Sequence, residues 1–174
     1  MGKRSSFERK EKDFYPTPKE AVSPLRPIVR GYTFVEPCAG DGTLINHLKE
    51  SMPKCVYASD ISPQAEGIHK LDALELTKEH CDDADYIITN PPWTRNVLHP
   101  MIEHFRQLLP TWLLFDADWM HTKQAIPYLP YCKAIVSVGR VKWIPDSKHT
   151  GKDNACWYLF MREKQETVFY GRTT

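Results

Sequence analysis

The sequence lacks the features that place a chain in a membrane or outside the cell. No apolar run approaches the roughly 18 residues that a membrane-crossing helix needs. The N-terminal stretch MGKRSSFERKEKDF contains no apolar core of a secretory signal. The five cysteines are odd in number and widely spaced, which is typical of free thiols rather than of a disulfide framework. We therefore expect a cytoplasmic protein without a membrane partner.

The sequence also lacks metal-binding spacings and a strong excess of one charge. The seven histidines are scattered, and neither CxxC nor HExxH occurs, so we expect no metal site. The 23 basic and 22 acidic residues leave a net charge of +1, which is less than many nucleic-acid-binding proteins carry. Binding to a polyanion would therefore depend on a local basic patch.

The length of 174 residues fits one domain with a full-sized core. Residues 1–12 are polar and highly charged, and we expect them to form a mobile arm ahead of a single domain over residues 13–174. Thr17, Pro18 and Glu20 match a capping box with proline at the first helical position. A helix should begin there, and Pro24 and Pro27 should shorten or kink it.

Predicted strands and helices alternate along the rest of the chain. We expect strands over 33–36, 54–59, 67–72, 85–89, 111–116, 134–143 and 155–161, and helices over 43–51, 73–80, 97–109 and 119–129. This alternation predicts an α/β fold with a mostly parallel, seven-stranded sheet and helices on both faces. The last two strands have no helix between them and should form an antiparallel hairpin. Ligands of such sheets bind outside the carboxyl ends of the strands.

The stretch VEPCAGDGTL, residues 35–44, joins the first strand to the first helix of this pattern. Its two glycines, Gly40 and Gly42, permit a tight turn and a close approach of the backbone to a ligand. Asp60 ends the second strand about 20 residues later, where an acid can accept hydrogen bonds from ribose hydroxyls. The glycines do not match GxGxxG, and Glu36 and Asp41 would repel a pyrophosphate. An adenosyl cofactor with a cationic tail fits better; the alternative is an ordinary turn with solvated acids.

Asp72 lies in the stretch LDAL, residues 71–74, at the end of the third predicted strand. Its carboxylate could accept a hydrogen bond from the exocyclic amine of a bound adenine. The alternative is that Asp72 caps the N-terminus of the following helix.

The stretch TNPPW, residues 89–93, follows the fourth predicted strand. The side chain of Asn90 and the backbone carbonyl of Pro91 are two acceptors on a stiff segment, and together they fit a planar amino group with two N–H donors. Binding both hydrogens favours a pyramidal nitrogen with a free lone pair, which a methyl acceptor needs. Trp93 offers a face for base stacking, worth roughly 1–3 kcal/mol. The alternative is a rigid turn with Trp93 in the core.

The segments DFYPTP, EPCAGDG, SD, LDA and NPPW occur in this order. Together they resemble the class I S-adenosylmethionine-dependent methyltransferases that modify amino groups, and most specifically the small phage-type DNA adenine-N6 methyltransferases. The C-terminal part from LLFDADWM onward is similar too, so the resemblance covers nearly the whole chain from Asp13. It implies a Rossmann-like fold with S-adenosylmethionine as the cofactor.

The resemblance also implies roles for individual residues. The methionine end of the cofactor would contact Tyr15, Thr17 and Pro18, and the main cofactor loop would be formed by Glu36, Ala39 and Gly40. The ribose would be held by Asp60 with Ile61, and the adenine by Asp72 with Ala73. The target base would be gripped by the catalytic residues Asn90, Pro91, Pro92 and Trp93, and Asn90 would also border the cofactor.

The expected activity is transfer of a methyl group to adenine N6 in single- or double-stranded DNA. Transfer would be direct and in line, without a cysteine nucleophile; a base in a duplex would have to be flipped out first. We expect no separate target-recognition domain of the kind that larger members of the family carry. RNA methylation at adenine N6 or guanine N2, glutamine methylation of a protein, and non-catalytic cofactor binding that acts on a host partner remain alternatives. A phage-encoded protein would work in the host cytoplasm.

The longest polar segment between late strands is KWIPDSKHTGKDN, residues 142–154. It should emerge at the carboxyl edge of the sheet, beside the glycine turn and NPPW. We expect this segment and the basic residue just before it to contact nucleic acid through Arg140, Lys142, Trp143, Lys148, His149 and Lys152. The alternative is a solvated hairpin loop.

Overall fold

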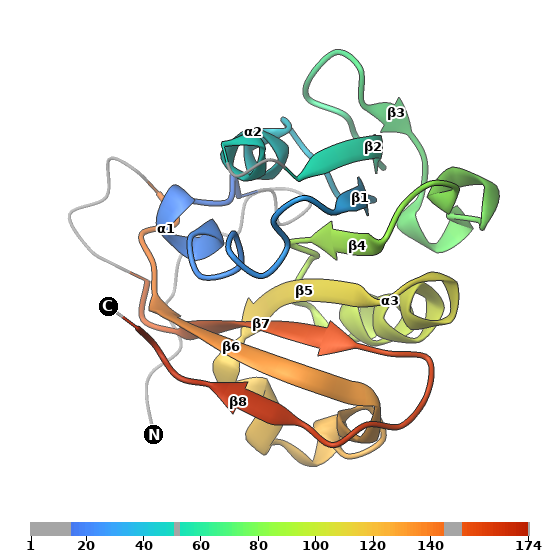
Figure 1. Cartoon of the computed structure of the whole chain (residues 1–174). Helices are drawn as coiled ribbons and strands as arrows, with labels where there is room; N and C mark the ends of the chain where they lie inside the picture. Colours follow the sequence, from blue (N-terminus) through green and yellow to red (C-terminus); the bar gives the residue numbers. More distant parts are fainter. Residues whose placement is uncertain (1–14, 51–52, 145–150, 174) are drawn as a thin grey trace.

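The structure is a computed structural model that describes residues 15–50, 53–144 and 151–173 (Figure 1). The expected arm over residues 1–12 lies outside the described residues. One sheet of eight strands has the order β3-β2-β1-β4-β5-β7-β6-β8. The strands are β1 Thr33–Glu36, β2 Lys54–Asp60, β3 His69–Lys70, β4 Tyr86–Thr89, β5 Thr111–Asp116, β6 Cys132–Arg140, β7 Asn154–Phe160 and β8 Val168–Tyr170.

The strand directions confirm the predicted α/β architecture. Strands β3, β2, β1, β4 and β5 run parallel to one another, whereas β7 is antiparallel to both β5 and β6. The predicted hairpin of the last two long strands is therefore β6–β7. The sequence did not predict β8, which pairs parallel with β6. β8 is a run of only three apolar residues, all exposed, and it lacks the alternation with polar residues that would mark a half-buried strand.

The helix predicted over 97–109 is present at nearly these bounds, whereas the other predicted helices are shorter or absent as α-helices. Within residues 15–50, 53–144 and 151–173, the α-helices are α1 Lys19–Val22, α2 Thr43–Lys49 and α3 Arg95–Leu108. The regions expected to be helical near 73–80 and 119–129 contain short 3₁₀ helices instead, namely η2 Ala73–Glu75, η3 Glu79–Cys81, η4 Ala117–His121, η5 Lys123–Ala125 and η6 Leu129–Tyr131. Pro127 and Pro130 lack the backbone N–H that a continuous helix needs in the second region. In the described parts of the chain, no helix is long and apolar enough to cross a membrane.

The predicted capping box at the start of α1 does not form. The N-cap of α1 is Pro18, and no side chain caps the helix. The hydroxyl of Thr17 instead accepts a hydrogen bond from the side chain of Asn90, which competes with the local cap. The predicted effect of Pro24 agrees with the structure, because α1 ends at Val22.

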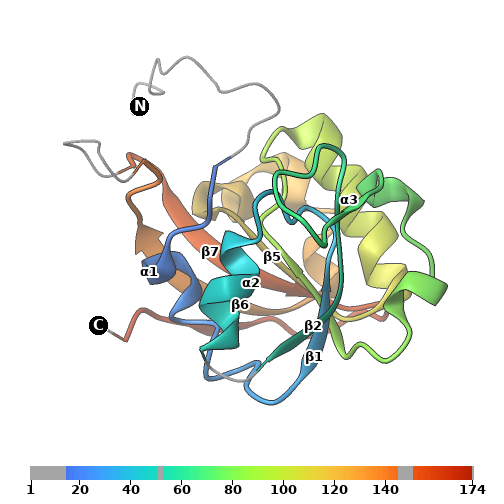
Figure 2. The ribbon, with the colours of Figure 1, turned by 90° about the horizontal axis from the view of Figure 1, so that it is seen from above.

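Two apolar layers cover the two faces of the sheet. Along β5, Trp112 and Leu114 belong to the layer that includes α1 and α2, whereas Leu113 and Phe115 belong to the layer that includes α3. Figure 2 shows α1 and α2 on one side of the strands and α3 on the other. Trp157 in β7 also donates its indole N–H to the backbone oxygen of Ala21 at 2.8 Å, which fixes α1 against the sheet.

Candidate functional site

Polar side chains gather where the parallel strands end. Glu36, Asp60, Thr89 and Asp116 are the last residues of β1, β2, β4 and β5. Because these strands run parallel, their carboxyl ends share one edge of the sheet. In Figure 1 the arrowheads of β4 and β5 point towards the side on which α1 lies. The structure therefore brings the predicted cofactor loop and the tetrad Asn90–Trp93 to the same edge.

The glycine turn after β1 is fastened to the end of β2. Gly40 and Gly42 both adopt positive φ angles, 55° and 79°, which glycine tolerates without strain. The backbone N–H of Gly40 donates to Oδ2 of Asp60 at 2.8 Å, and Oδ1 of Asp60 accepts from the N–H of Ser62 at 2.7 Å. Each carboxylate oxygen keeps a second lone pair, so a ribose hydroxyl could still bind there. The ribose contact itself stays a prediction.

Glu36 presents a buried carboxyl at this edge. Its side chain is almost fully buried, and Oε2 has no hydrogen-bond partner. Burial raises the pKa of Glu36 well above its ordinary value, and the charges of Asp60 and Asp41 raise it further. A cationic group placed beside Glu36 would relieve both effects. The carboxyl groups of Glu36, Asp60 and Asp41 at this edge therefore fit the cationic tail of the predicted cofactor.

Several other buried polar atoms near this edge also lack partners. Besides Oε2 of Glu36 these are Oγ of Ser59, Oγ1 of Thr89 and Nη1 of Arg95; within the described residues, only Nε1 of Trp112 shares this property elsewhere. Buried polar atoms in proteins normally have hydrogen-bond partners. Their concentration at one edge of the sheet is what a site for a polar ligand would show.

Asp72 performs the role that the sequence left as an alternative. It is the N-cap of η2, and its Oδ1 accepts a hydrogen bond from the N–H of Leu74 at 2.9 Å. Its neighbour Ala73 is buried in the apolar layer that includes α3. The carboxylate keeps free lone pairs for the predicted adenine contact of Asp72, which stays a prediction.

The remaining predicted cofactor residues lie close to these groups along the chain. Tyr15 and Pro18 are half-buried on either side of the buried Thr17, and Ile61 is exposed directly after Asp60. Cys38, between Glu36 and Ala39, has a pKa that burial and then the charge of Asp60 raise far above the usual thiol range. Its thiol is therefore protonated near neutral pH.

A chain of hydrogen bonds runs through the tetrad. The side-chain nitrogen Nδ2 of Asn90 donates to Oγ1 of Thr17 at 3.1 Å. The indole Nε1 of Trp93 donates to Oδ1 of Asn90 at 3.2 Å and also to the backbone oxygen of Leu114 at 3.1 Å. The tetrad is thereby tied to the segment before α1 and to the central strand β5. The sequence did not predict these contacts.

Trp93 combines the two roles that the sequence left open. The ring is half-buried and packs against both apolar layers, as a core residue would. It also meets Trp143 edge to face, with ring centroids 5.3 Å apart and an interplanar angle of 90°. Trp143 was predicted to contact nucleic acid, and the structure places it directly against the tetrad.

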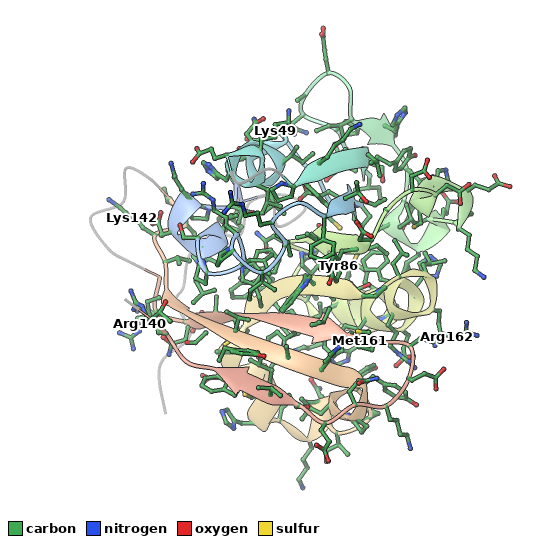
Figure 3. The ribbon with its side chains drawn as sticks, viewed as in Figure 1. Lys49, Tyr86, Arg140, Lys142, Met161 and Arg162 are labelled. Atoms are coloured by element: carbon green, nitrogen blue, oxygen red, sulfur yellow. The ribbon has the colours of Figure 1, made fainter. Side chains whose placement is uncertain are left out.

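The predicted nucleic-acid segment is described only in part, because Lys148 and His149 lie outside the described residues. Arg140 ends β6, Lys142 is half-buried, and Lys152 is exposed. Figure 3 shows Arg140 and Lys142 on the same side of the molecule, away from Arg162. The start and end of the segment are joined, since the N–H of Gly151 donates to the oxygen of Val141 at 2.9 Å. Of the described residues of this segment, Trp143 is the one with a contact to the tetrad, and the contact of the basic residues with nucleic acid stays a prediction.

The structure adds an ion pair that the sequence analysis missed. Arg95 follows the tetrad and donates from Nη2 to Oδ2 of Asp116 at 2.7 Å. Oδ1 of Asp116 accepts from the N–H of Asp118, and the hydroxyl of Tyr158 donates to the backbone oxygen of Asp116. The only signal in the sequence was the position of Asp116 at the end of a predicted strand.

Comparison with known proteins supports the fold. No family model and no curated protein sequence matches the chain. A candidate RNA methyltransferase from Pyrococcus horikoshii has a TM-score of 0.60 at 16% identity, covering 92% of each chain. The methyltransferase subunit of a type I restriction-modification system from Streptococcus thermophilus has a TM-score of 0.58 at 12% identity, covering 90% of this chain and 47% of its own. A candidate haemolysin from Lactococcus lactis has a TM-score of 0.58 at 11% identity, covering 91% of this chain and 94% of its own.

These similarities establish the architecture but do not identify the substrate. The protein has the mostly parallel α/β fold that the sequence predicted, and it shares this fold with solved methyltransferase structures. Identities of this size show the fold alone, and neighbours with such different descriptions share it. The activity must therefore be argued from the residues at the carboxyl edge.

Proposed function

We propose that this protein is an S-adenosylmethionine-dependent methyltransferase that modifies the N6 amino group of adenine in DNA. The observation that carries the proposal is the position of Asn90. Its side-chain oxygen is held by Trp93 at the same sheet edge as the unpartnered carboxyl of Glu36. Methyl transfer to an amino group requires a hydrogen-bond acceptor for that group beside a site for a cationic cofactor, and this edge of the sheet offers both.

The cofactor would be held by the acids at the ends of the first strands. Glu36 would bind the cationic amino-acid tail, Asp60 the ribose, and Asp72 the adenine. When bound, S-adenosylmethionine supplies an electrophilic methyl group. The glycine turn allows the backbone of Gly40 to approach this ligand closely.

The target amine would be bound by oxygen atoms of the tetrad. A carbonyl oxygen has two lone pairs, so Oδ1 of Asn90 can keep the hydrogen bond from Trp93 and still accept one from the amine. The backbone oxygen of Pro91 is the second acceptor. With both hydrogens held, the nitrogen lone pair is directed away from the tetrad and towards the cofactor. Most of the catalytic effect would then come from orientation.

The proposal is tested by supplying cofactor with a labelled methyl group together with DNA, RNA or protein. We expect label in DNA, recovered as N6-methyladenine by mass spectrometry of the nucleosides. Label in RNA alone, or on protein glutamine alone, would show that the proposed substrate is wrong and that the proposed methyl transfer is right. Cofactor binding without transfer to any of these acceptors would contradict the enzymatic function and favour a cofactor-binding protein that acts on a host partner.

Cofactor binding should release a proton from Glu36. In the free protein the raised pKa keeps this carboxyl protonated above the ordinary carboxyl range, and a bound cation would lower that pKa again. Affinity should therefore increase as the pH rises towards the raised pKa of the free protein, and level off above it. Calorimetry in buffers of different ionisation enthalpy would measure the released proton.

Glu36→Gln provides the control for this measurement. The amide has nearly the same shape but does not titrate, so the proton release should disappear and the affinity should become lower and independent of pH over this range. Wild-type binding that releases no proton would show that the cation is not bound beside Glu36.

The basic residues around Trp143 should carry the contact with the DNA backbone. Replacing Lys142 and Lys152 by alanine should weaken DNA binding and flatten its salt dependence, by about 0.9 in slope for each phosphate that the protein no longer neutralises. Cofactor affinity should not change. The matched control replaces Arg162 and Lys164, which lie after β7, by alanine and so removes the same amount of positive charge. In Figure 3, Arg162 is on the side opposite Arg140. Equal weakening in both double variants would indicate that the DNA-binding surface is not local.

A further inference from the structure

The two hydrogen-bond partners of Asn90 differ in what they can accept. The amide of Asn90 has an oxygen and a nitrogen of similar size, so its partners determine which end faces which way. The hydroxyl of Thr17 can either donate or accept, and it would be satisfied by either end of the amide. The indole nitrogen of Trp93 can only donate, so the end of the amide that faces it must be the oxygen. Trp93 is therefore the group that sets the orientation.

Trp93 is itself held in a fixed position. Its N–H is shared between Asn90 and the backbone oxygen of Leu114, which is fully buried in β5. The ring packs against both apolar layers and against Trp143. Because β5 lies between β4 and β7 in the sheet, the donor has a rigid support. The orientation of Asn90 is thus determined by the core and not by solvent.

We infer that Trp93 is a positioning residue for methyl transfer. Its indole N–H keeps the side-chain oxygen of Asn90 turned towards the target amine. The inference rests on the proposed function. If the amide rotated by half a turn, its NH₂ group would face the hydrogens of the target amine, and neither group could accept. Stacking of a base needs only the face of the ring, whereas this role needs the N–H.

The two roles are separated by changing the N–H while keeping the ring. 3-Benzothienylalanine incorporated at position 93 has a sulfur atom in place of the indole N–H and nearly the same shape. We expect kcat to fall about three- to tenfold, the effect of losing one neutral hydrogen bond, with little change in KM for DNA or in the Kd of the cofactor. Trp93→Phe should lower kcat similarly and also raise KM, because the stacking face becomes smaller.

Trp112→Phe is the matched control for the phenylalanine variant. Trp112 is buried on the same strand β5 as Leu114, and its Nε1 has no hydrogen-bond partner to lose. We expect wild-type kcat and KM from this variant. A benzothienyl variant with the kcat of the wild type would overturn the positioning role and leave Trp93 as a stacking surface.

A second readout does not depend on activity. The five tryptophans give five indole N–H signals in a ¹⁵N NMR spectrum, and Trp93→Phe identifies the signal of Trp93. Asn90→Ala should shift this signal strongly; an unchanged signal would show that the hydrogen bond is absent and would overturn the inference. Absence of methyl transfer by the wild-type protein to any acceptor would contradict both the proposed function and the positioning role. Wild-type activity with an insensitive benzothienyl variant would remove the positioning role alone.

Discussion

Replacing Asn90 by alanine is expected to lower kcat for methyl transfer by about 100-fold or more, the size of effect seen when a group that holds the reacting atoms is removed. The substitution removes the oxygen that would bind the target amine and leaves Trp93 hydrogen-bonded only to Leu114. The fold should remain intact, because Asn90 is only half-buried and lies after the end of β4. Steady-state kinetics with labelled cofactor would measure the loss.

Asn96→Ala is the matched control for this experiment. Asn96 is exposed in the first turn of α3, six positions after Asn90, and we expect its removal to leave kcat unchanged. Cofactor affinity should stay close to that of the wild type in both variants, which would separate a catalytic loss from a binding loss. Near-normal turnover by Asn90→Ala would refute the proposed grip on the amine.

Replacing Asp60 by alanine should raise the Kd of S-adenosylmethionine by at least about tenfold, because hydrogen bonds to a charged acceptor contribute roughly 1.5–3 kcal/mol each. The structure gives a second reason for a large effect. Asp60 also holds the N–H groups of Gly40 and Ser62, so its loss would loosen the glycine turn that the cofactor is expected to approach. Calorimetry would measure the change in affinity.

Two further variants separate these contributions. Asp60→Asn keeps one acceptor oxygen and nearly the same shape, so it should lose less affinity than Asp60→Ala. Asp82→Ala removes an exposed carboxylate just after η3, and its Kd should equal that of the wild type. An unchanged Kd for Asp60→Ala would mean that the cofactor binds elsewhere.

The parts of the fold that the sequence predicted are those with strong periodic signals. Buried apolar runs such as Tyr86–Thr89 and Thr111–Asp116 identify strands because such segments have few other stable conformations. The series of 3₁₀ helices after β5 carries no such signal, and the apolar run of the exposed β8 is only three residues long. Their conformation depends on what they pack against, and local sequence does not specify that.

The candidate site shows the same division. Positions at strand ends, such as Glu36, Asp60 and Asn90, could be predicted because topology brings all parallel strand ends to one edge. Pairings between side chains could not. The hydroxyl of Thr17 looks like a local helix cap in the sequence, but its partner lies 73 residues further along the chain. Such a contact exists only after the sheet has formed.

The bond from Trp157 to the oxygen of Ala21 bears on when this protein can first function during its synthesis. The partners are 136 residues apart, and β7, which carries Trp157, fills the position between β5 and β6. Loops of this length close slowly, so contacts that depend on them form late. A ribosome-bound chain that ends before residue 154 lacks the strand against which α1 is fixed, and Thr17 lies two residues ahead of α1. Without β7 the Thr17 contact of Asn90 is not fixed, and β5, which supports Trp93 through Leu114, has no neighbour on one side. On the proposed function, methyl transfer should therefore begin only after β7 has been made.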